Sequence, residues 1–213
     1  MRIVIAGGHG QIALHLSARL AQSGHTPVGL IRNPDHADDL AGAEPLVLDL
    51  ETSSVDDVAA ALEGADAVVF AAGAGPGSTA ERKLTVDRDG AVLLADAAEA
   101  AGVRRIVVIS AMSADDFDAA STDVFQIYLR AKSEADAHVR ASSLDWTIVR
   151  PGGLTDDDPT GLVTVGETVP RGSISRVDVA AVVAELLEDQ LAIGRQFEVI
   201  GGSTTVREAL AGL

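Results

Sequence analysis

The hydrophobic positions of this chain form two kinds of segment that alternate along its length. Short continuous apolar runs, rich in β-branched residues, are typical of strands buried on both faces, as in a parallel sheet. Between them lie Ala- and Leu-rich stretches in which apolar residues recur at helical spacing. The pattern predicts strands at residues 3–5, 28–31, 46–48, 67–70, 106–109, 146–149 and 196–200. It predicts helices around residues 14–20, 55–62, 86–101, 124–140, 177–187 and 206–210.

This alternation indicates one α/β domain spanning residues 1–213. With the right-handed crossovers usual for such units, the alternation predicts the Rossmann class, a doubly wound parallel sheet in a three-layer α/β/α arrangement. Helix ends are marked by Gly24, Gly64 and Gly102, because a left-handed C-cap favours glycine. Ser54 and Asp57 have the spacing of a capping box. Residues 73–80 and 114–123 are predicted to be loops. Residues 151–175 depart from the alternation, and we expect residues 151–175 and 196–213 to form a small cover on the substrate side.

Composition narrows the possible functions. The chain has 32 acidic and 16 basic residues, a net charge of −16, which argues against binding nucleic acid over a broad face. It has no cysteine, which excludes disulfides and thiolate metal sites. The five histidines show no ligand spacing, and residues 156–158, three consecutive aspartates, are typical of a solvated turn, so we expect no metal. The apolar run at residues 1–6 is too short for a signal peptide or a membrane span, so we expect a cytoplasmic protein without a membrane partner.

The first predicted strand runs directly into a glycine-rich turn and then a helix. Gly7, Gly10 and Ala13 have the spacing of a dinucleotide-binding turn. The first glycine permits the tight bend, the second lets the pyrophosphate approach the backbone, and the small third residue lets helix and strand pack closely. The amide groups at the helix N-terminus would then face the phosphates. The cofactor contacts expected here are Gly7, His9, Gly10, Gln11 and Ile12; a solvated loop side chain is the alternative for His9.

The end of the second strand selects between the two nicotinamide dinucleotides. An acidic residue at this place would bind the ribose hydroxyls of NAD, but the chain has Arg32 and Asn33. A guanidinium suits bidentate recognition of the 2′-phosphate, so we expect NADP(H) rather than NAD(H) as the cofactor. The alternative interpretation is a surface arginine at a strand end. Asp35 lies slightly beyond and is expected to cap the next helix.

These motifs resemble the short-chain dehydrogenase/reductase superfamily. More narrowly, the chain is similar to the atypical, single-domain NAD(P)H-binding branch described as NAD-dependent epimerase/dehydratase-like or NmrA-like. The resemblance runs through residues 5–10, 30–34, 71–73, 85–87, 101–105, 128–132 and 144–152. It implies that Asp49 and Leu50 lie beside the adenine. It further implies that Ala71, Ala72 and Gly73 line the adenosine side of the cleft and that Pro151, Gly152 and Leu154 border the nicotinamide.

Tyr128 and Lys132 match the superfamily's Tyr-x-x-x-Lys pair, whose spacing places both on one helix face. The resemblance implies that the tyrosine is the general acid or base at the substrate oxygen. The lysine would lower the tyrosine pKa and hold the nicotinamide ribose. Composition adds a separate argument, because Tyr128 is the only tyrosine and Lys83 and Lys132 are the only lysines among 16 basic residues. Arginine does not imitate a compact ammonium. An ordinary helix pair is the alternative interpretation.

Two positions depart from the superfamily pattern. Ala111 aligns with the usual carbonyl-holding serine, which leaves Ser110 as the catalytic candidate and Ser113 as a second stand-in. Asp87 replaces the usual asparagine, either as a structural cap or water anchor or as a catalytic group.

Three functions follow from these observations. The Tyr-Lys pair favours an NADP(H)-dependent oxidoreductase acting on a small carbonyl or quinone-like compound. The missing serine favours a non-catalytic NADP(H)-binding redox sensor. An epimerase or dehydratase is disfavoured, because little chain remains for a sugar-nucleotide domain. The sequence leaves the substrate, the direction of hydride transfer and the oligomeric state open.

Overall fold

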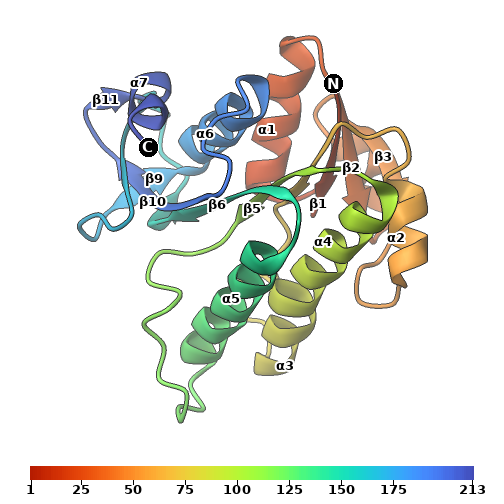
Figure 1. The fold of residues 1–213 in the computed structure, drawn as a ribbon, viewed down its shortest axis with the longest axis horizontal. Coiled ribbons are helices and arrows are strands. Elements are labelled where there is room, and N and C mark those ends of the chain that lie inside the picture. Colours follow the sequence, from red (N-terminus) through yellow and green to blue (C-terminus); the bar gives the residue numbers. More distant parts are fainter.

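The computed structural model describes residues 1–213 and places a nine-stranded sheet between two layers of helices (Figure 1). In order across the sheet, the strands are β11 (Thr204–Thr205), β8 (Leu162–Gly166), β10 (Arg195–Gly201), β6 (Asp145–Pro151), β5 (Arg105–Ile109), β4 (Ala67–Phe70), β1 (Arg2–Ala6), β2 (Thr26–Ile31) and β3 (Glu44–Val47). From β10 to β3, all neighbouring strands are parallel. The winding direction reverses between β1 and β4, which is where open α/β sheets bind ligands.

Helices cover both faces of this sheet. On one face lie α1 (Gln11–Gln22), α6 (Arg176–Glu188) and α7 (Val206–Ala211). On the other lie α2 (Val55–Ala61), α4 (Gly90–Ala101) and α5 (Val124–Ala141). The alternating side chains of β1 show why both faces are apolar: Ile3 and Ile5 belong to the core under α1 and α6, and Val4 belongs to the core under α2 and α4.

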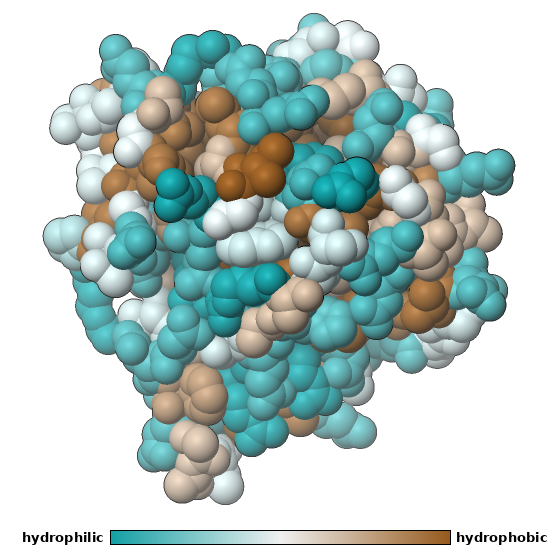
Figure 2. Space-filling model, viewed as in Figure 1, coloured by the Kyte–Doolittle hydropathy of each residue, from teal (hydrophilic) through white to brown (hydrophobic).

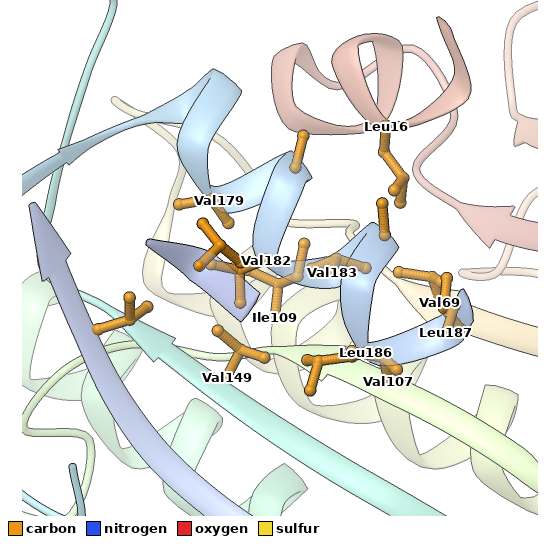
Figure 3. Packing of buried hydrophobic residues seen from close by; sticks show 14 of the residues in the cluster. Leu16, Val69, Val107, Ile109, Val149, Val179, Val182, Val183, Leu186 and Leu187 are labelled. Atoms are coloured by element: carbon orange, nitrogen blue, oxygen red, sulfur yellow. The ribbon is translucent and has the colours of Figure 1, made fainter. Parts of the chain in front are cut away.

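The core between α6 and the sheet is built from β-branched and leucine side chains. Figure 3 shows Val182 and Val183 of α6 close to Val107 and Val149 of the sheet, with Leu16 of α1 beside them. The outer surface differs, since hydrophilic residues cover most of the face drawn in Figure 2. No helix is both long and apolar enough to cross a membrane.

The predicted fold class is confirmed, and so are the local end signals. Gly24, Gly64 and Gly102 have φ of +81°, +74° and +72°. The Ser54 hydroxyl accepts from the Asp57 amide, and the Ser54 amide donates to the Asp57 carboxylate, which completes the capping box.

The helix predicted at residues 86–101 begins earlier than the sequence indicated. The helical path starts with α3 (Ala80–Arg82), continues as a π-helix over Lys83–Asp89 and becomes α4 at Gly90. The Thr79 side chain accepts from the Arg82 amide and so caps the new start. π-Helical turns are rare and often occur at functional sites, so the segment 83–89 is of interest for the site.

Residues 151–175 contain three short strands. Two of them, β7 (Gly153–Thr155) and β9 (Ser173–Ser175), form a separate parallel pair, whereas β8 joins the main sheet antiparallel to β10. The predicted strand at 196–200 and the predicted helix at 206–210 are present as β10 and α7. Both are part of the main sheet and its α6 layer.

Candidate dinucleotide and substrate site

The turn after β1 is shaped by glycine. Gly7 has φ of +80°, and a Cβ there would lie 2.6 Å from the Cα of Ala72 on the neighbouring strand's loop. Gly10 is the N-cap of α1 and has no side-chain cap, so the first amide groups of the helix have no side-chain partner at that end. A Cβ on Gly10 would meet only carbonyl oxygens, that of Gly7 at 3.1 Å and that of Ala71 at 3.7 Å. This open cradle at a helix N-terminus fits a pyrophosphate.

Gly8 has a structural role that the motif did not identify. Its amide donates to the carbonyl of Leu30 at 2.9 Å, and a Cβ on Gly8 would lie 2.6 Å from the Cα of Gly29. The turn is therefore fastened directly to the backbone of β2. A glycine inside the otherwise apolar strand β2 is the sequence signal for this close approach.

A cleft of about 320 Å³ opens at the ends of β1, β2 and β4. Nine of the predicted cofactor contacts line it: Gly7, His9, Gly10, Arg32, Asp49, Leu50, Ala71, Ala72 and Gly73. Gln11 and Ile12 lie in the first turn of α1 and are not part of its lining. Asn33 is not part of it either, because its side chain accepts from the Asp35 amide and caps the 3-10 helix Pro34–Asp39. The expectation that Asp35 is that cap was wrong, because Asp35 lies inside the first turn.

Charged side chains gather at the β2 end of the cleft. The Glu51 carboxylate accepts from Arg82 at 2.5 Å and from the Thr85 hydroxyl at 2.7 Å, and lies 3.4 Å from Arg32. The Arg82 hydrogen bond outweighs partial burial and lowers the pKa of Glu51. Arg32 remains 57% exposed. Glu51 and Arg82 were not identified from the sequence, because they lie 19 and 50 positions from Arg32 and carry no motif.

Two histidines also border this end of the cleft. The rings of His9 and His36 stack at a centroid distance of 3.8 Å, and His9 Nε2 lies 3.1 Å from a carboxylate oxygen of Asp39. The stack fixes the His9 ring beside His36, while the His9 side chain stays 38% exposed.

Tyr128 and Lys132 lie on one face of α5, as their spacing predicts. Lys132 is buried, and its ammonium donates to the Ile109 carbonyl at 3.2 Å, with a carboxylate oxygen of Asp87 at 3.4 Å. The ammonium lies 5.9 Å from the centre of the Tyr128 ring. Burial raises the pKa of the Tyr128 phenol, and the opposing effect of Lys132 is smaller. The implied lowering of this pKa by Lys132 therefore exists, but it does not determine the net shift.

The second lysine flanks the same ring. The Lys83 ammonium lies 5.1 Å from the centre of the Tyr128 ring and donates to the Gly75 carbonyl at 2.9 Å. Both lysines of the chain thus contact its only tyrosine. The π-helix Lys83–Asp89 supplies Lys83 at its start and Asp87 near its end, where the Asp87 carboxylate also accepts from the Ala74 amide at 3.1 Å. The rarity of lysine was a signal for position 83 as much as for position 132.

Ser110 belongs to a buried polar network. Its hydroxyl donates at 2.7 Å to Asp136, which is fully buried and is also bound by Arg150 at 2.7 Å. Arg150 in turn binds Asp115, at 2.7 and 3.0 Å. Burial raises the pKa of Asp136, whereas hydrogen bonding to Arg150 lowers the pKa of Asp115 to about 2. Because the Ser110 hydroxyl is committed to Asp136, its contact with a substrate oxygen competes with this hydrogen bond.

A second cavity, of about 480 Å³, lies beside Tyr128. It contains the predicted nicotinamide neighbours Pro151, Gly152 and Leu154 together with Ser110, Ala111 and Ser113. The predicted cover contributes residues 151–154, Arg171 and Gly172, and no residue of 196–213 lines this cavity. The structure contains no group of three or more His, Cys, Asp or Glu residues that could hold a metal ion.

The geometry agrees with comparisons with known proteins. The model of the NAD(P)H-binding family matches residues 7–190. The chain belongs to the NAD(P)H-binding family. The Bacillus subtilis protein YhfK, named as an uncharacterized sugar epimerase, is 35% identical over 213 residues that cover 99% of each chain. A Bacillus halodurans structure described as a candidate NAD-dependent epimerase/dehydratase is 37% identical, covers 100% of both chains and has a TM-score of 0.91. The Lactococcus lactis oxidoreductase ylbE is 29% identical, with a TM-score of 0.89, over 100% of this chain and 96% of that one.

These findings confirm the resemblance to the epimerase/dehydratase-like branch and the Rossmann fold. They also confirm a nicotinamide dinucleotide as the cofactor class. The family is oxidoreductase-like, and the residues around Gly10 fit such a cofactor, as the open cradle there shows.

Proposed function

We propose that this chain is an NADP(H)-dependent oxidoreductase that reduces a small carbonyl or quinone-like compound. The observation that carries the proposal is the position of Tyr128. It lies next to a buried lysine and lines the cavity formed by Pro151, Gly152 and Leu154, the side on which the resemblance places the nicotinamide.

A bound nicotinamide supplies the hydride, and the chain supplies the proton. Because burial raises the pKa of Tyr128, its hydroxyl is protonated at neutral pH and is ready to donate to a substrate oxygen. Lys132 provides a positive charge beside the Tyr128 ring, and its ammonium is held in place by the Ile109 carbonyl and by Asp87. Asp87 thus acts as the counter-charge that keeps Lys132 in place.

The preference for NADP(H) rests on Arg32, with Arg82 as a second cation at the same end of the cleft. A 2′-phosphate would bind these guanidinium groups in competition with Glu51. We therefore expect a moderate preference for NADP(H) rather than an absolute one.

The substitution Tyr128→Phe tests the catalytic role. It removes only the hydroxyl oxygen, and general acid catalysis contributes about 10² to 10⁴-fold, or about 3 to 5 kcal/mol of barrier. NADPH consumption over a panel of carbonyls and quinones should fall at least about a hundredfold, while NADP⁺ affinity by calorimetry stays the same. Lys132→Ala should lower both quantities.

A matched control is Ser142→Ala, which removes one hydroxyl from the C-terminal end of the same helix and leaves the cavity intact. Turnover should be unchanged in this variant. Equal turnover in wild type and Tyr128→Phe would reject the proposal.

A redox sensor is the second candidate, because Ala111 cannot donate to a carbonyl and the Ser110 hydroxyl points to Asp136. A sensor predicts that Tyr128→Phe has no effect and that a partner protein binds with an affinity set by NADP(H). Ala111 also predicts that an oxidoreductase is slow on simple ketones, so the panel must include quinones.

A further inference from the structure

Arg171 is an unpaired cation on the wall of the substrate-side cavity. It is exposed, lines the same cavity as Tyr128, and has no side-chain hydrogen bond or ion pair in the structure. Most basic side chains of this chain are held by an acid, including the nearby Arg176, which pairs with Asp156 at 2.6 Å. In a chain with twice as many acidic as basic residues, an arginine without an acidic partner is available to an external anion.

The backbone beside Arg171 is firmly placed. The carbonyl of Gly172 accepts from the Gly153 amide at 2.9 Å, and a Cβ on Gly172 would lie 2.9 Å from a side-chain atom of Ile200. Gly152 packs against the same carbonyl, since a Cβ there would lie 2.4 Å from it. The loop that carries Arg171 is therefore attached to the end of β6, next to the expected nicotinamide position.

The rest of the cavity wall is mainly apolar. Phe125 is 59% exposed and Leu154 is 39% exposed, although large hydrophobic side chains of this protein are otherwise mostly buried. The Phe125 ring lies 6.0 Å from the Tyr128 ring and lines the same cavity, so an apolar surface adjoins the phenol. Asp116 is the one carboxylate in the lining, and it would repel an anion bound on its own side.

We propose that the substrate is an amphipathic anion: an aromatic or otherwise apolar body that carries the reducible carbonyl or quinone and an anionic group. The apolar body covers Phe125 and Leu154, and the anionic group binds the guanidinium of Arg171. The volume of about 480 Å³ suits a molecule of this size. This inference rests on the proposed function and defines the substrate class of the same site.

The test uses a pair of fluorescent probes that differ by one charge and needs no turnover. 1-Anilinonaphthalene-8-sulfonate carries a sulfonate, and N-phenyl-1-naphthylamine has the same aromatic body without it. Both are titrated into the full chain with saturating NADP⁺, which keeps the probes out of the dinucleotide cleft. The sulfonate should bind about tenfold more tightly to wild type, the low end of what a charge-assisted hydrogen bond contributes.

Arg171→Met should remove this preference and leave binding of the neutral probe unchanged. Phe125→Ala should weaken both probes. Arg195→Met is the matched control, because Arg195 is also exposed without a side-chain partner but lines a different cavity; it should change neither probe. Equal affinity of the two probes for wild type, or a retained preference in Arg171→Met, would overturn the proposal.

A second measurement separates this inference from the catalytic proposal. 4-Carboxybenzaldehyde and its methyl ester are compared as substrates in wild type and Arg171→Met. A higher kcat/KM for the acid that disappears in Arg171→Met supports the anion site. Equal kcat/KM for acid and ester in wild type contradicts it, while turnover lost in Tyr128→Phe would still support the oxidoreductase. A chain that turns over neither these two compounds nor any quinone of the panel, but keeps the probe preference, fails the catalytic proposal and retains the anion site.

Discussion

The cleft at the ends of β1 and β2 is shaped mainly by backbone, whereas the cavity at the ends of β5 and β6 rests on buried side chains. In the cleft, glycines bring the turn after β1 close to the backbone of β2 and to the loop after β4, and the charged groups stay near solvent at the rim. Around the cavity, Ser110, Asp136 and Arg150 are nearly inaccessible, and the Asp136 carboxylate binds both of the others.

This difference predicts different consequences of mutation. A change of a charged side chain at the cleft should affect ligand binding with little loss of stability, because these groups are exposed and weakly coupled. A change in the buried network of Ser110, Asp136 and Arg150 should lower the free energy of unfolding more than it affects ligand binding, because a buried charge without its partner is costly.

The largest effect is expected for Arg150→Met. The substitution leaves the carboxylate of Asp136, already fully buried, without its main cation, and breaking a buried pair in this way costs about 3 to 5 kcal/mol. Urea unfolding measures the change. The control is Arg104→Met, whose pair with Asp145 is exposed and screened by solvent, so the loss of stability should be much smaller. Similar losses in the two variants would contradict the contrast between network and rim.

Gly10→Val should reduce dinucleotide affinity at least about a hundredfold, or about 2.8 kcal/mol, because the side chain occupies the space that the pyrophosphate needs. The protein should stay folded, since a Cβ at Gly10 has only the Gly7 carbonyl within 3.4 Å. Gly8→Val should instead unfold the chain, because its Cβ would lie 2.6 Å from the Cα of Gly29. Calorimetry with NADP⁺ and circular dichroism separate the two outcomes; retained affinity in Gly10→Val would place the phosphates elsewhere.

Arg32→Ser should weaken NADP⁺ binding about tenfold, or about 1.4 kcal/mol, and leave NAD⁺ nearly unchanged. The effect is moderate because Arg32 is largely exposed and shares Glu51 with Arg82. Glu51→Gln should act in the opposite direction, because it releases both guanidinium groups to the 2′-phosphate. Calorimetric titration of both dinucleotides measures this, and equal or tighter binding of NAD⁺ to wild type would reject the role of Arg32.

The smallest effect concerns acid. Asp115 has a pKa of about 2 in the folded protein and an ordinary value of 3.8, so it binds protons more weakly when folded. Its stabilising contribution is therefore present above about pH 4 and is lost as the pH falls toward 2. Because the Asp115 side chain is 51% exposed, solvent screening limits this contribution to less than about 1 kcal/mol.

The comparison of wild type with Asp115→Asn checks this prediction. The difference in unfolding free energy between the two proteins should shrink between pH 5 and pH 2.5. A constant difference over that range would show that the Arg150 pair does not depress the Asp115 pKa.

Local signals were sufficient for much of the fold. The strands, the capping box of Ser54 and Asp57 and the glycine turn at Gly7 and Gly10 each depend on residues within a few positions of one another. Helix spacing likewise placed Tyr128 and Lys132 on one face. Such features are set by backbone geometry and side-chain periodicity, which a single sequence records directly.

Other features were not recorded in the sequence pattern, and some of them are local. Asn33 rather than Asp35 became the cap because of the path of the chain after β2. The start of the helix near Thr79 was missed because its π-helical part breaks the usual spacing. The Tyr128 pKa rises because burial of the phenol by tertiary packing raises it more than the charge of Lys132 lowers it. These outcomes required the full three-dimensional surroundings of each residue.

The sequence by itself determined the strand-helix order, the glycine turn and the chemistry available at Tyr128 and Lys132, because each is encoded in neighbouring residues. Only the tertiary structure decided which partners these groups have. It brought Lys83 to Tyr128, 45 positions apart, Ser110 to Asp136, 26 positions apart, and Glu51 to Arg82, 31 positions apart. The physical reason is that burial and hydrogen bonding depend on which segments the folded sheet brings together, and hydrophobic periodicity contains no record of those pairings.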